Sequence, residues 1–330
     1  MLLPVRDGMP YLAFTARTLT RAAAPPIEIV VVDDGSLDGT PAFLADWAVR
    51  DPRVRVNSPG RVGLVAALNA GLDACRAPFV ARVDADDLVA PERFVRQLAR
   101  LVAEELDVVG TGVRCFPATA VAGGLRRYEA WQNGLTTHDA MARERFVESP
   151  LVHPSVMFRR AAVLAVGGYR AMGYPEDYDL WLRLFSAGAR FGKCPEVLTF
   201  WRERPDRLTR TAAVCTPEAI ADCKVEHLLA GPLRGAQRIY VAGAGDDAKR
   251  LATRLRLRGQ RIVAFLDLNP RRVGQHIGEV PVRRLEDVRA DLGGGSVVLA
   301  AIGGAGRRSG VRAYFEGHGL MECQDFWLVA

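Results

Sequence analysis

Short apolar runs alternate with amphipathic segments along the first two-thirds of the chain. IEIVVVDDGS (27–36) is rich in β-branched residues and ends in a polar turn, which is typical of a buried parallel strand. TPAFLADWA (40–48) then reads as a helix, with Thr40 as N-cap, Pro41 at the first helical position and an apolar face that includes Trp47. This strand and helix are the first pair in a repeating strand–helix pattern.

The same rhythm continues to about residue 104. The predicted elements are a strand at RVRV (53–56), a helix at GLVAALNAGLDAC (63–75), a strand at FVARV (79–83) and an amphipathic helix over 91–104. Alternating strands and helices favour an α/β fold with an open, mostly parallel sheet flanked by helices.

Residues 112–150 lose this rhythm, and we expect them to lie over the sheet edge. Regularity returns with PSVMFRRAAVLAVGGYR (154–170) and with the helix YDLWLRLFSAG (178–188). A second α/β pattern follows a connecting helix: strand RIYVAG (238–243), a Gly-rich turn, a helix over 248–259, and strands at 261–267 and 296–303. The predicted domains are therefore 1–212, a linker helix at 213–235, and a smaller Rossmann-like α/β domain at 236–330.

Composition supports a globular protein of about two domains. The 330 residues are 49% hydrophobic and 25% charged. The net charge of +6 suits anionic small molecules or an anionic membrane face, and solvated basic helix faces explain it equally well. No run approaches the ~18 apolar residues of a membrane span, and MLLPVRDGMPYL lacks the pattern of a signal peptide. Six scattered cysteines without a CxxC pair suggest reduced thiols, so we expect a cytoplasmic protein.

Acidic side chains follow two of the predicted strands. Asp33 and Asp34 end one strand, and Asp84, Asp86 and Asp87 end another. In open α/β sheets ligands bind beyond the carboxyl ends of the strands, so both clusters should face one cleft. Oxygen-only ligands select Mg²⁺ or Mn²⁺, which complete their shells with substrate phosphates and so point to a diphosphate. The alternative is helix capping, for which Asp87 is well placed.

A third acidic group lies in GGYRAMGYPEDYDLWLRL (167–184). Glu176 and Asp177 occupy a Gly/Pro-rich loop just before a helix, where a carboxylate can serve as a general base. The alternative for these two residues and for Asp179 is favourable charge at a helix N-terminus. Trp181 is expected to pack this helix and is also counted among the candidate substrate-binding residues.

Five motifs in series, MLLPVRDGMPYL, EIVVVDDGSLDGT, GLVAALNAGL, ARVDADD and PEDYDLWLRL, resemble the family 2 glycosyltransferases with a GT-A fold over about residues 1–210. The resemblance implies an inverting transfer of a sugar from a nucleotide diphosphate sugar to a hydroxyl acceptor in glycan or polysaccharide biosynthesis. The implied acceptor is a sugar, a lipid-linked sugar or a protein, and no nucleic acid takes part.

The resemblance also implies roles for single residues. Pro4, Val5 and the Asp33/Asp34 turn would hold the nucleoside. Asp84 and Asp86 match the DXD motif, in which Asp86 would bind Mg²⁺ or Mn²⁺ and Asp84 would contact the ribose, the metal or its water. Asp177 would deprotonate the acceptor, with Glu176 beside it.

Other assignments have structural alternatives of comparable weight. Arg61 and Asn69 stand where the family often has nucleotide contacts, His153 could line the acceptor side, and Arg202, Arg204 and Arg207 stand where the family has a loop that closes on the pyrophosphate. The family usually has Tyr-Asn where this chain has Arg6-Asp7, which puts the nucleoside contacts there in doubt.

Two other function classes stay open. One is a catalytically silent nucleotide-sugar-binding or scaffold protein, in which the second domain could also form a homodimer. The other is an NAD(P)-linked oxidoreductase, because YVAGAGDDAKRL contains G-x-G-x-x-A, with Asp267 22 residues beyond Gly245. Asp246 and Asp247 disfavour it, since they bring negative charge to the helix end that would hold a pyrophosphate.

A basic run marks the helix of this second domain: Lys249, Arg250, Arg254, Arg256, Arg258 and Arg261. It is most simply a solvated helix face. Contact with a membrane surface, at the inner face, or with nucleic acid is the alternative, which the absence of aromatic residues from the run disfavours.

Overall fold

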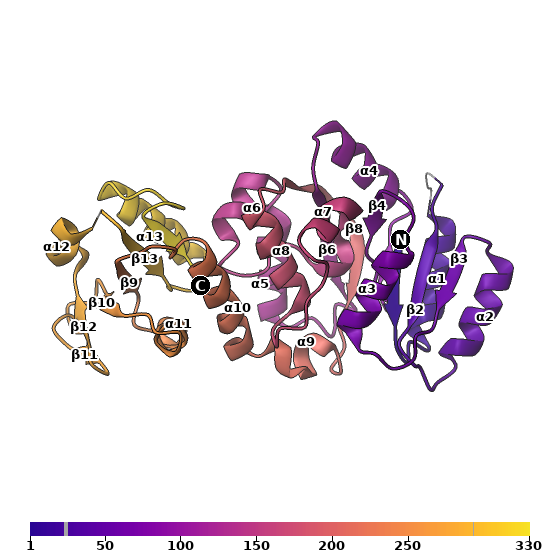
Figure 1. The fold of residues 1–330 in the computed structure, drawn as a ribbon, viewed down its shortest axis with the longest axis horizontal. Helices are drawn as coiled ribbons and strands as arrows, with labels where there is room; N and C mark the ends of the chain where they lie inside the picture. Colours follow the sequence, from indigo (N-terminus) through magenta and orange to yellow (C-terminus); the bar gives the residue numbers. More distant parts are fainter. Residues whose placement is uncertain (23–25, 293) are drawn as a thin grey trace. The chain divides into compact units, whose positions relative to one another are not determined.

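Two units make up the part of the chain that the computed structural model describes, residues 1–22, 26–292 and 294–330 (Figure 1). The first unit comprises Met1–Met141, Pro150–Met172 and Glu176–Thr211. The second comprises Ala142–Ser149, Gly173–Pro175 and Ala212–Ala330. The sequence pattern indicated one change of domain near residue 212. It did not indicate that two short earlier segments belong to the second unit.

The first unit begins with a parallel sheet in the order β1-β2-β3. Its strands are β1 (Leu2–Val5), β2 (Ile29–Asp33) and β3 (Val54–Asn57), and its helices are α1 (Tyr11–Arg21), α2 (Thr40–Arg50) and α3 (Leu64–Ala74). Leu3 and Val31 join one apolar core with Trp47 of α2, whereas Leu2 and Val30 point to the opposite core with α3. Because both faces are covered, the strands are apolar throughout, as expected for a parallel sheet.

A second sheet continues the unit in the order β4-β7-β6-β8-β5. Its strands are β4 (Phe79–Ala81), β5 (Leu88–Val89), β6 (Val108–Phe116), β7 (Met157–Arg159) and β8 (Phe191–Arg202). β6 and β8 are parallel, but β7 runs antiparallel to β4 and β6, and β5 runs antiparallel to β8. The α/β class is confirmed, with the difference that this sheet is mixed. The reason is that β5 and β7 both enter the sheet from the carboxyl edge, β5 after the short acidic turn and β7 after the long excursion from β6.

Strand direction brings several chain segments to one edge. A parallel bridge between Leu2 and Arg82 aligns β4 with β1, and the two antiparallel pairings of β7 make β4 parallel to β6. The carboxyl ends of β1, β2, β4, β6 and β8 therefore share one edge, at which β7 begins. Ligand sites in open α/β sheets lie at such an edge.

Regular structure fills most of residues 112–150, although the sequence shows no strand–helix rhythm there. This segment holds the end of β6, α5 (Gly123–Gly134) and α6 (His138–Glu144). Asn133 accepts from Val113 N and donates to Val113 O, both at 2.8 Å, while Glu129 accepts from Cys115 N at 2.7 Å. α5 thus covers an edge of β6, which confirms the predicted position and satisfies backbone groups that would otherwise stay unpaired.

The remaining helices of this unit are α4 (Arg93–Ala103), α7 (Arg160–Ala165), α8 (Glu176–Ser186) and the short α9 (Leu208–Thr211), with a 3₁₀ turn at His153–Ser155. α8 and the 3₁₀ turn carry the acceptor-side candidates.

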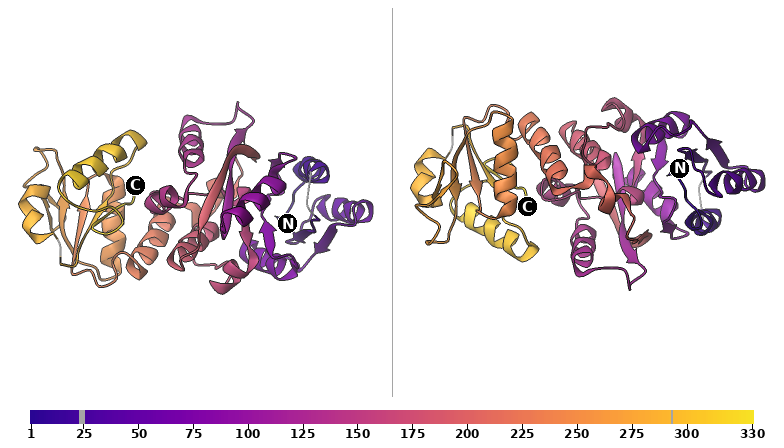
Figure 2. Two further views of the ribbon diagram at one scale, coloured as in Figure 1. Left: turned by 90° about the horizontal axis from the view of Figure 1, so that it is seen from above. Right: turned by 90° about the horizontal axis from the view of Figure 1, so that it is seen from below.

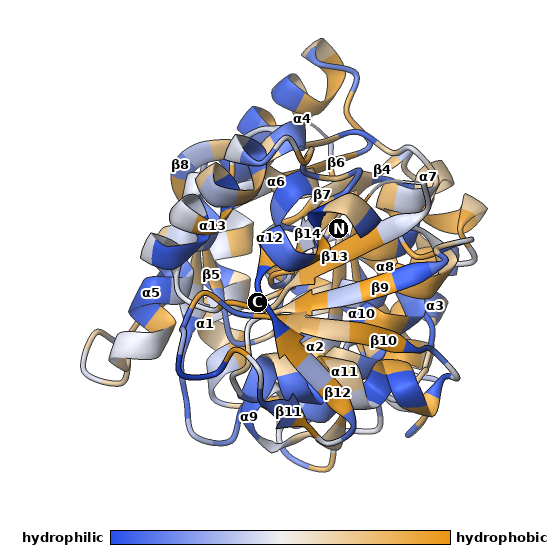
Figure 3. Ribbon diagram, turned by 90° about the vertical axis from the view of Figure 1, so that its left-hand side faces the viewer, coloured by the Kyte–Doolittle hydropathy of each residue, from blue (hydrophilic) through white to orange (hydrophobic). Residues whose placement is uncertain are grey.

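The second unit contains a sheet in the order β11-β12-β10-β9-β13-β14. Its elements are α10 (Pro217–Ala230), β9 (Arg238–Ala242), α11 (Asp246–Leu257), β10 (Ile262–Leu266), β11 (His276–Ile277), β12 (Val280–Arg283), α12 (Leu285–Val288), β13 (Ser296–Ala300), α13 (Ala305–Gly317) and β14 (Phe326–Leu328). The strands are parallel except β11, and the apolar β9, β10, β12 and β13 lie between helices on both faces (Figures 2 and 3). Gly243 has φ of 101°, and a Cβ there would lie 2.8 Å from Ala301 O, so the turn after β9 requires glycine.

Three arginines of the basic run are paired with carboxylates of α10. Arg250 pairs with Glu218, Arg254 with Asp222, and Arg258 with Glu226, at 3.2, 3.6 and 2.6 Å. Both helices repeat these residues every four positions, so the pairs form a ladder along the α10–α11 contact. These three residues are therefore partly exposed and paired, which the sequence pattern did not indicate.

No helix among the described residues combines the length and apolar character needed to cross a bilayer.

Candidate active site

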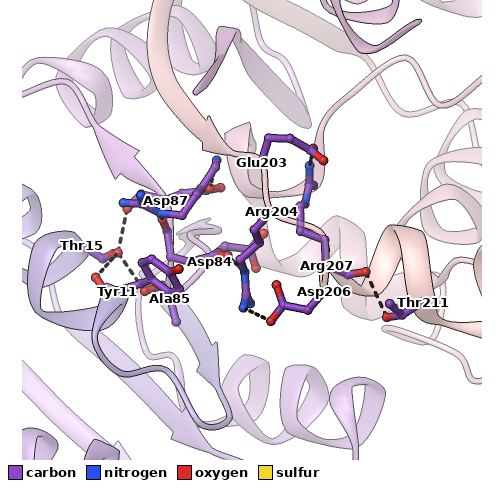
Figure 4. A network of polar contacts seen from close by, with 12 residues as sticks. Tyr11, Thr15, Asp84, Ala85, Asp87, Glu203, Arg204, Asp206, Arg207 and Thr211 are labelled. Carbon is purple, nitrogen blue, oxygen red and sulfur yellow. Dashed lines mark hydrogen bonds and ion pairs between the residues drawn. The ribbon is translucent and has the colours of Figure 1, made fainter. Parts of the chain in front are cut away.

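Three carboxylates converge just after β4. The ligand oxygens of Asp84, Asp86 and Asp87 all lie within 4.8 Å of one another. Thr15 of α1 holds their turn, because its hydroxyl lies 2.9 Å from Ala85 O and 2.8 Å from Asp87 O. Figure 4 shows Thr15 against this turn, with Arg204 and Arg207 in the segment that follows β8.

Arginine groups contact each of these acids. The buried Arg82 pairs with Asp84 at 2.5 Å, and Arg204 Nε donates to Asp86 Oδ2 at 2.9 Å. The backbone N–H of Arg202 donates to Asp87 Oδ1, and its Nε donates to the carbonyl of Asp86, both at 2.7 Å. The other oxygen of Asp87 is buried, and none of the residues that the structure describes donates a hydrogen bond to it.

The three acids differ in acidity. Burial alone would raise the pKa of Asp84, but the charge and hydrogen bond of Arg82, with weaker contributions from His153 and Arg207, together lower this pKa. Burial and then the Asp84 charge raise the pKa of Asp86, although Arg204 opposes the shift. Burial, with the charges of Asp84 and Asp86, raises the pKa of Asp87 well above its usual range. The cluster therefore carries excess negative charge whenever all three are ionised.

The donor set fits a hard divalent cation. It consists of carboxylate oxygens, and the unpartnered Asp87 oxygen is a buried acceptor that a cation would satisfy. Mg²⁺ and Mn²⁺ prefer such oxygens and tolerate only a few protein ligands. Asp84, Asp86 and Asp87 are the residues that could hold this ion.

The acceptor-side acids begin α8. Asp177 Oδ1 accepts from Tyr178 N at 2.7 Å, and Glu176 stands beside it. Burial, followed by the Glu176 charge, raises the pKa of Asp177 to about 8. A carboxyl group with this pKa is a stronger base than an ordinary aspartate when ionised.

A buried histidine stands behind Glu176. His153 Nδ1 lies 3.6 Å from Glu176 Oε1, and its Nε2 lies 3.0 Å from the Tyr169 hydroxyl. Burial and then the Arg82 charge lower the pKa of His153. Burial opposes ionisation of Glu176, but the His153 contact, a backbone hydrogen bond and the Arg82 charge together outweigh it and lower the pKa of Glu176. Glu176 thus stays charged beside Asp177.

Trp181 and Asp179 are buried residues of α8 that anchor this helix to its neighbours. Trp181 is fully buried, and its ring meets His153 edge-on with centroids 5.9 Å apart. A ligand cannot reach it, so its predicted place among the substrate contacts is corrected to packing. Asp179 is also fully buried and pairs with Arg170 and Arg183, at 2.7 Å each, in agreement with its structural alternative.

The predicted nucleoside side lies at the ends of β1 and β2. Asp33 Oδ1 accepts from Ser36 N at 3.0 Å, and Asp34 Oδ1 accepts from Val62 N and Gly63 N at 2.6 and 2.8 Å. Pro4 and Val5 are buried in β1. Asp33 and Asp34 thus hold two loops at the sheet edge that also carries Asp84, Asp86 and Asp87.

Arg61 and Asn69, predicted as nucleotide contacts, lie in different environments. Arg61 is exposed in the loop that Asp34 holds. Asn69 binds Tyr169 with both ends of its amide, donating to Tyr169 O and accepting from Tyr169 N at 2.9 Å each. These contacts favour a structural role for Asn69 over a nucleotide contact. They also hold Tyr169, whose hydroxyl contacts His153.

The Arg6-Asp7 departure has a local explanation. Asp7 has φ of 48°, accepts from Leu37 N at 2.7 Å and donates from its own N to Ser36 Oγ at 2.8 Å. Aspartate adopts this left-handed conformation more readily than most residues. Asp7 therefore ties the loop after β1 to the turn after β2.

Sequence reasoning missed Arg82, Thr15 and Tyr169. Arg82 had a usable signal, since an arginine two residues before Asp84 in extended chain lies on the same face. Thr15 and Tyr169 carry no local signal, because each acts on residues far away in the chain.

Comparisons with known proteins agree with this geometry. The family model described as "Glycosyl transferase family 2" matches residues 2–167, about half of the chain. The amylovoran biosynthesis glycosyltransferase AmsE of Erwinia amylovora is 34% identical over 185 residues, covering 56% of this chain and 67% of that protein.

Two solved structures share the fold. S. aureus TarS 1–349 in complex with UDP-GlcNAc superposes with a TM-score of 0.57 at 18% identity, covering 69% of this chain and 65% of that chain. The mannosyltransferase PcManGT from Pyrobaculum calidifontis, in complex with GDP-Man and Mn²⁺, gives 0.52 at 20% identity, covering 69% and 62%. This chain thus spans slightly less than two thirds of either structure, and at these identities the likeness shows the fold alone.

Proposed function

The chain belongs to glycosyltransferase family 2, and on that premise we propose that it transfers a sugar from a nucleotide diphosphate sugar to a hydroxyl acceptor with inversion. One observation carries the proposal: the Asp84–Asp87 acids and the Glu176–Asp177 pair, far apart in the chain, belong to one sheet edge, with Arg82 acting on both groups. A donor diphosphate and an acceptor hydroxyl need these two kinds of group side by side.

The donor would lie along this edge. Pro4, Val5, Asp33 and Asp34 stand where the nucleoside is expected, and TarS and PcManGT are described with UDP-GlcNAc and GDP-Man. Asp86 and Asp84 would hold Mg²⁺ or Mn²⁺, and PcManGT is described with Mn²⁺. Such an ion supplies positive charge to the departing diphosphate. Arg204, at 2.9 Å from Asp86, adds a protein cation at the same place.

Asp177 would act on the acceptor. Its carboxylate takes the proton of the acceptor hydroxyl while that oxygen forms a bond to the anomeric carbon. The bond from this carbon to the diphosphate oxygen breaks on the opposite face, and the electron pair leaves with the diphosphate. One base therefore suffices, and inversion follows. Glu176, kept ionised by His153, maintains the basicity of Asp177.

The acceptor that suits glycan synthesis is a sugar, free or lipid-linked, presented at the cytoplasmic face of a membrane. AmsE is described as acting in amylovoran biosynthesis, which supports a role in polysaccharide assembly.

Asp177→Asn tests the proposal. The variant should still be stabilised by UDP-, GDP- or dTDP-sugars with Mn²⁺ in thermal unfolding, as wild type is, but lose transfer by about 10²–10⁴-fold. Asp73→Asn, at an exposed carboxylate of α3, is the matched control and should keep full activity. Unchanged turnover in Asp177→Asn would refute the base. Donor binding by wild type without transfer or hydrolysis would instead favour the silent-protein alternative.

A further inference from the structure

Three aromatic side chains form a group that the mechanism above does not use. We call Tyr128, Trp131 and Trp201 the α5–β8 aromatic cluster. The ring centroids of Tyr128 and Trp131 are 5.7 Å apart, and those of Tyr128 and Trp201 are 6.3 Å apart. All three residues are half-buried. Aromatic rings bury much apolar area when covered, so three partly exposed rings in contact make a favourable surface for a ligand.

The cluster is held rigidly without a ligand. Glu129 and Asn133, on the same helix as Tyr128 and Trp131, bind the backbone of β6. The guanidinium of Arg207 lies 3.9 Å from the Trp201 ring centroid and is itself paired with Glu203 at 2.9 Å. Rings fixed in advance cost little ordering when a ligand binds.

The guanidinium of Arg207 links the cluster to the candidate active site, because it lies over the Trp201 ring and its charge lowers the pKa of Asp84. Trp201 itself directly precedes Arg202, whose side chain binds the Asp86–Asp87 turn from the opposite face of β8. Trp201 also stands at the carboxyl end of β8, the sheet edge that carries the acids. The predicted nucleoside contacts end strands of the other sheet, so the cluster is a separate surface at the same edge.

The chemistry of this surface suits a pyranose ring. Such a ring has a C–H face that packs on aromatic rings, and its hydroxyl rim can accept from an arginine such as Arg207. We propose that the α5–β8 aromatic cluster binds a sugar ring of the acceptor, an assignment that rests on the proposed function. The donor sugar is the competing occupant, and shifts of the Trp131 and Trp201 signals caused by a nucleotide sugar without any glycoside would assign the cluster to it and overturn the proposal.

Indole NMR of the full chain, ¹⁵N-labelled at its five tryptophans, tests this assignment. The probes are methyl glycosides of glucose, galactose, mannose and N-acetylglucosamine, added with UDP or GDP and Mg²⁺. Trp131→Phe and Trp201→Phe assign the two signals. At least one glycoside should shift both signals and leave that of the buried Trp47 unchanged. Trp327, in the second unit, serves as a further internal control.

Substitutions of Trp201 and Tyr128 test whether the aromatic rings themselves bind the glycoside that causes the NMR shifts. Trp201→Leu and Tyr128→Leu should weaken binding of that glycoside about tenfold or more, a difference of about 1.4 kcal/mol. Tyr128→Phe keeps the ring and should bind like wild type. Nucleotide-dependent thermal stabilisation, equal in wild type and Trp201→Leu, shows that the variant is folded.

The outcomes separate the two proposals. If nucleotides stabilise the protein but no glycoside shifts Trp131 and Trp201, the acceptor assignment is overturned while the proposed function stands. Shifts caused by UDP or GDP alone would also overturn it, because the cluster would then stack the nucleobase. Absence of any nucleotide binding by wild type would refute the proposed function itself.

Discussion

Asp177 and Glu176 are adjacent, half-buried acids at the start of α8. Their environments push the pKa values apart: the His153 contact keeps Glu176 ionised, while burial and the Glu176 charge raise the pKa of Asp177. A separation of this kind commonly distinguishes a base from the group that tunes it. The Arg82 charge acts on both acids and limits how far the Asp177 pKa rises.

The pH dependence of transfer should report this pair. The value of kcat/KM is expected to rise as pH increases through about 8, because only ionised Asp177 accepts the acceptor proton. Glu176→Gln removes a neighbouring negative charge, which should move the rise to lower pH. The measurement is a pH–rate profile of both proteins at saturating metal. A profile that is flat across the neutral and alkaline range would contradict the assignment.

Local signals were enough to find the acids but not their partners. Asp84, Asp86 and Asp87 follow an apolar strand, and Glu176 and Asp177 follow a Gly/Pro-rich loop, so both groups are visible in the sequence. The Tyr169–His153–Glu176 chain is not, because it is assembled by tertiary packing. Asn69 shows the same limit, since its spacing suited a ligand contact and its amide binds the backbone of Tyr169.

At the scale of elements, helix α3 packs closely on β1 and β2. Gly71 faces these strands, and a Cβ there would meet Leu2 and lie 2.9 Å from Val32 Cγ2. Both neighbours are buried, and neither is free to move away. Glycine is therefore required by this close approach, not by helix propensity.

Gly71→Ala should lower the free energy of unfolding by about 1–3 kcal/mol, the usual cost of overpacking. Gly124→Ala is the matched control, because Gly124 lies in α5 with open space where a Cβ would be placed. Alanine there should be neutral or stabilise by up to about 1 kcal/mol. Urea unfolding of the three proteins measures both effects. Equal destabilisation by the two substitutions would show that α3 does not approach the sheet this closely.

Periodicity predicted several helices that bury apolar faces, but it missed α1, which buries Leu12 and Leu19, and α5, which docks through polar groups. α2 and α3 have apolar stripes, and their predicted ranges match the structure within two residues. α5 buries Gln132, and the Glu129 and Asn133 side chains of this helix dock to the edge of β6 through hydrogen bonds. A helix that docks through polar groups does not need apolar residues at helical spacing, so its sequence lacks the pattern that predicts a helix.

At the scale of the whole molecule, the second unit takes in a segment from the middle of the chain. Glu144 is paired with Arg308 and Arg312, and the Phe146 ring lies edge-on to Trp327 with centroids 5.7 Å apart. Phe146 is only 3% exposed. Sequence patterns could not show this, because the partners are far apart in the chain and each looks like an ordinary part of its own element.

A chain shortened to residues 1–211 should therefore be less stable than the intact protein. It keeps Glu144 and Phe146 but lacks Arg308, Arg312 and Trp327, so a charge and an apolar ring lose their partners. Thermal unfolding and light scattering should show a lower transition and aggregation. Phe146→Ser in the shortened chain should reduce the aggregation. If the shortened chain unfolds like the intact protein, these contacts do not stabilise it.

The central claim is that the acids after β4 gather around a divalent ion at the donor diphosphate. A crystal grown with Mn²⁺ and the nucleoside diphosphate that stabilises the protein tests it through the anomalous signal of manganese. The account predicts a manganese peak within coordination distance of an Asp86 carboxylate oxygen and of the diphosphate. Bound nucleotide with manganese absent from Asp86, or located elsewhere, would contradict it.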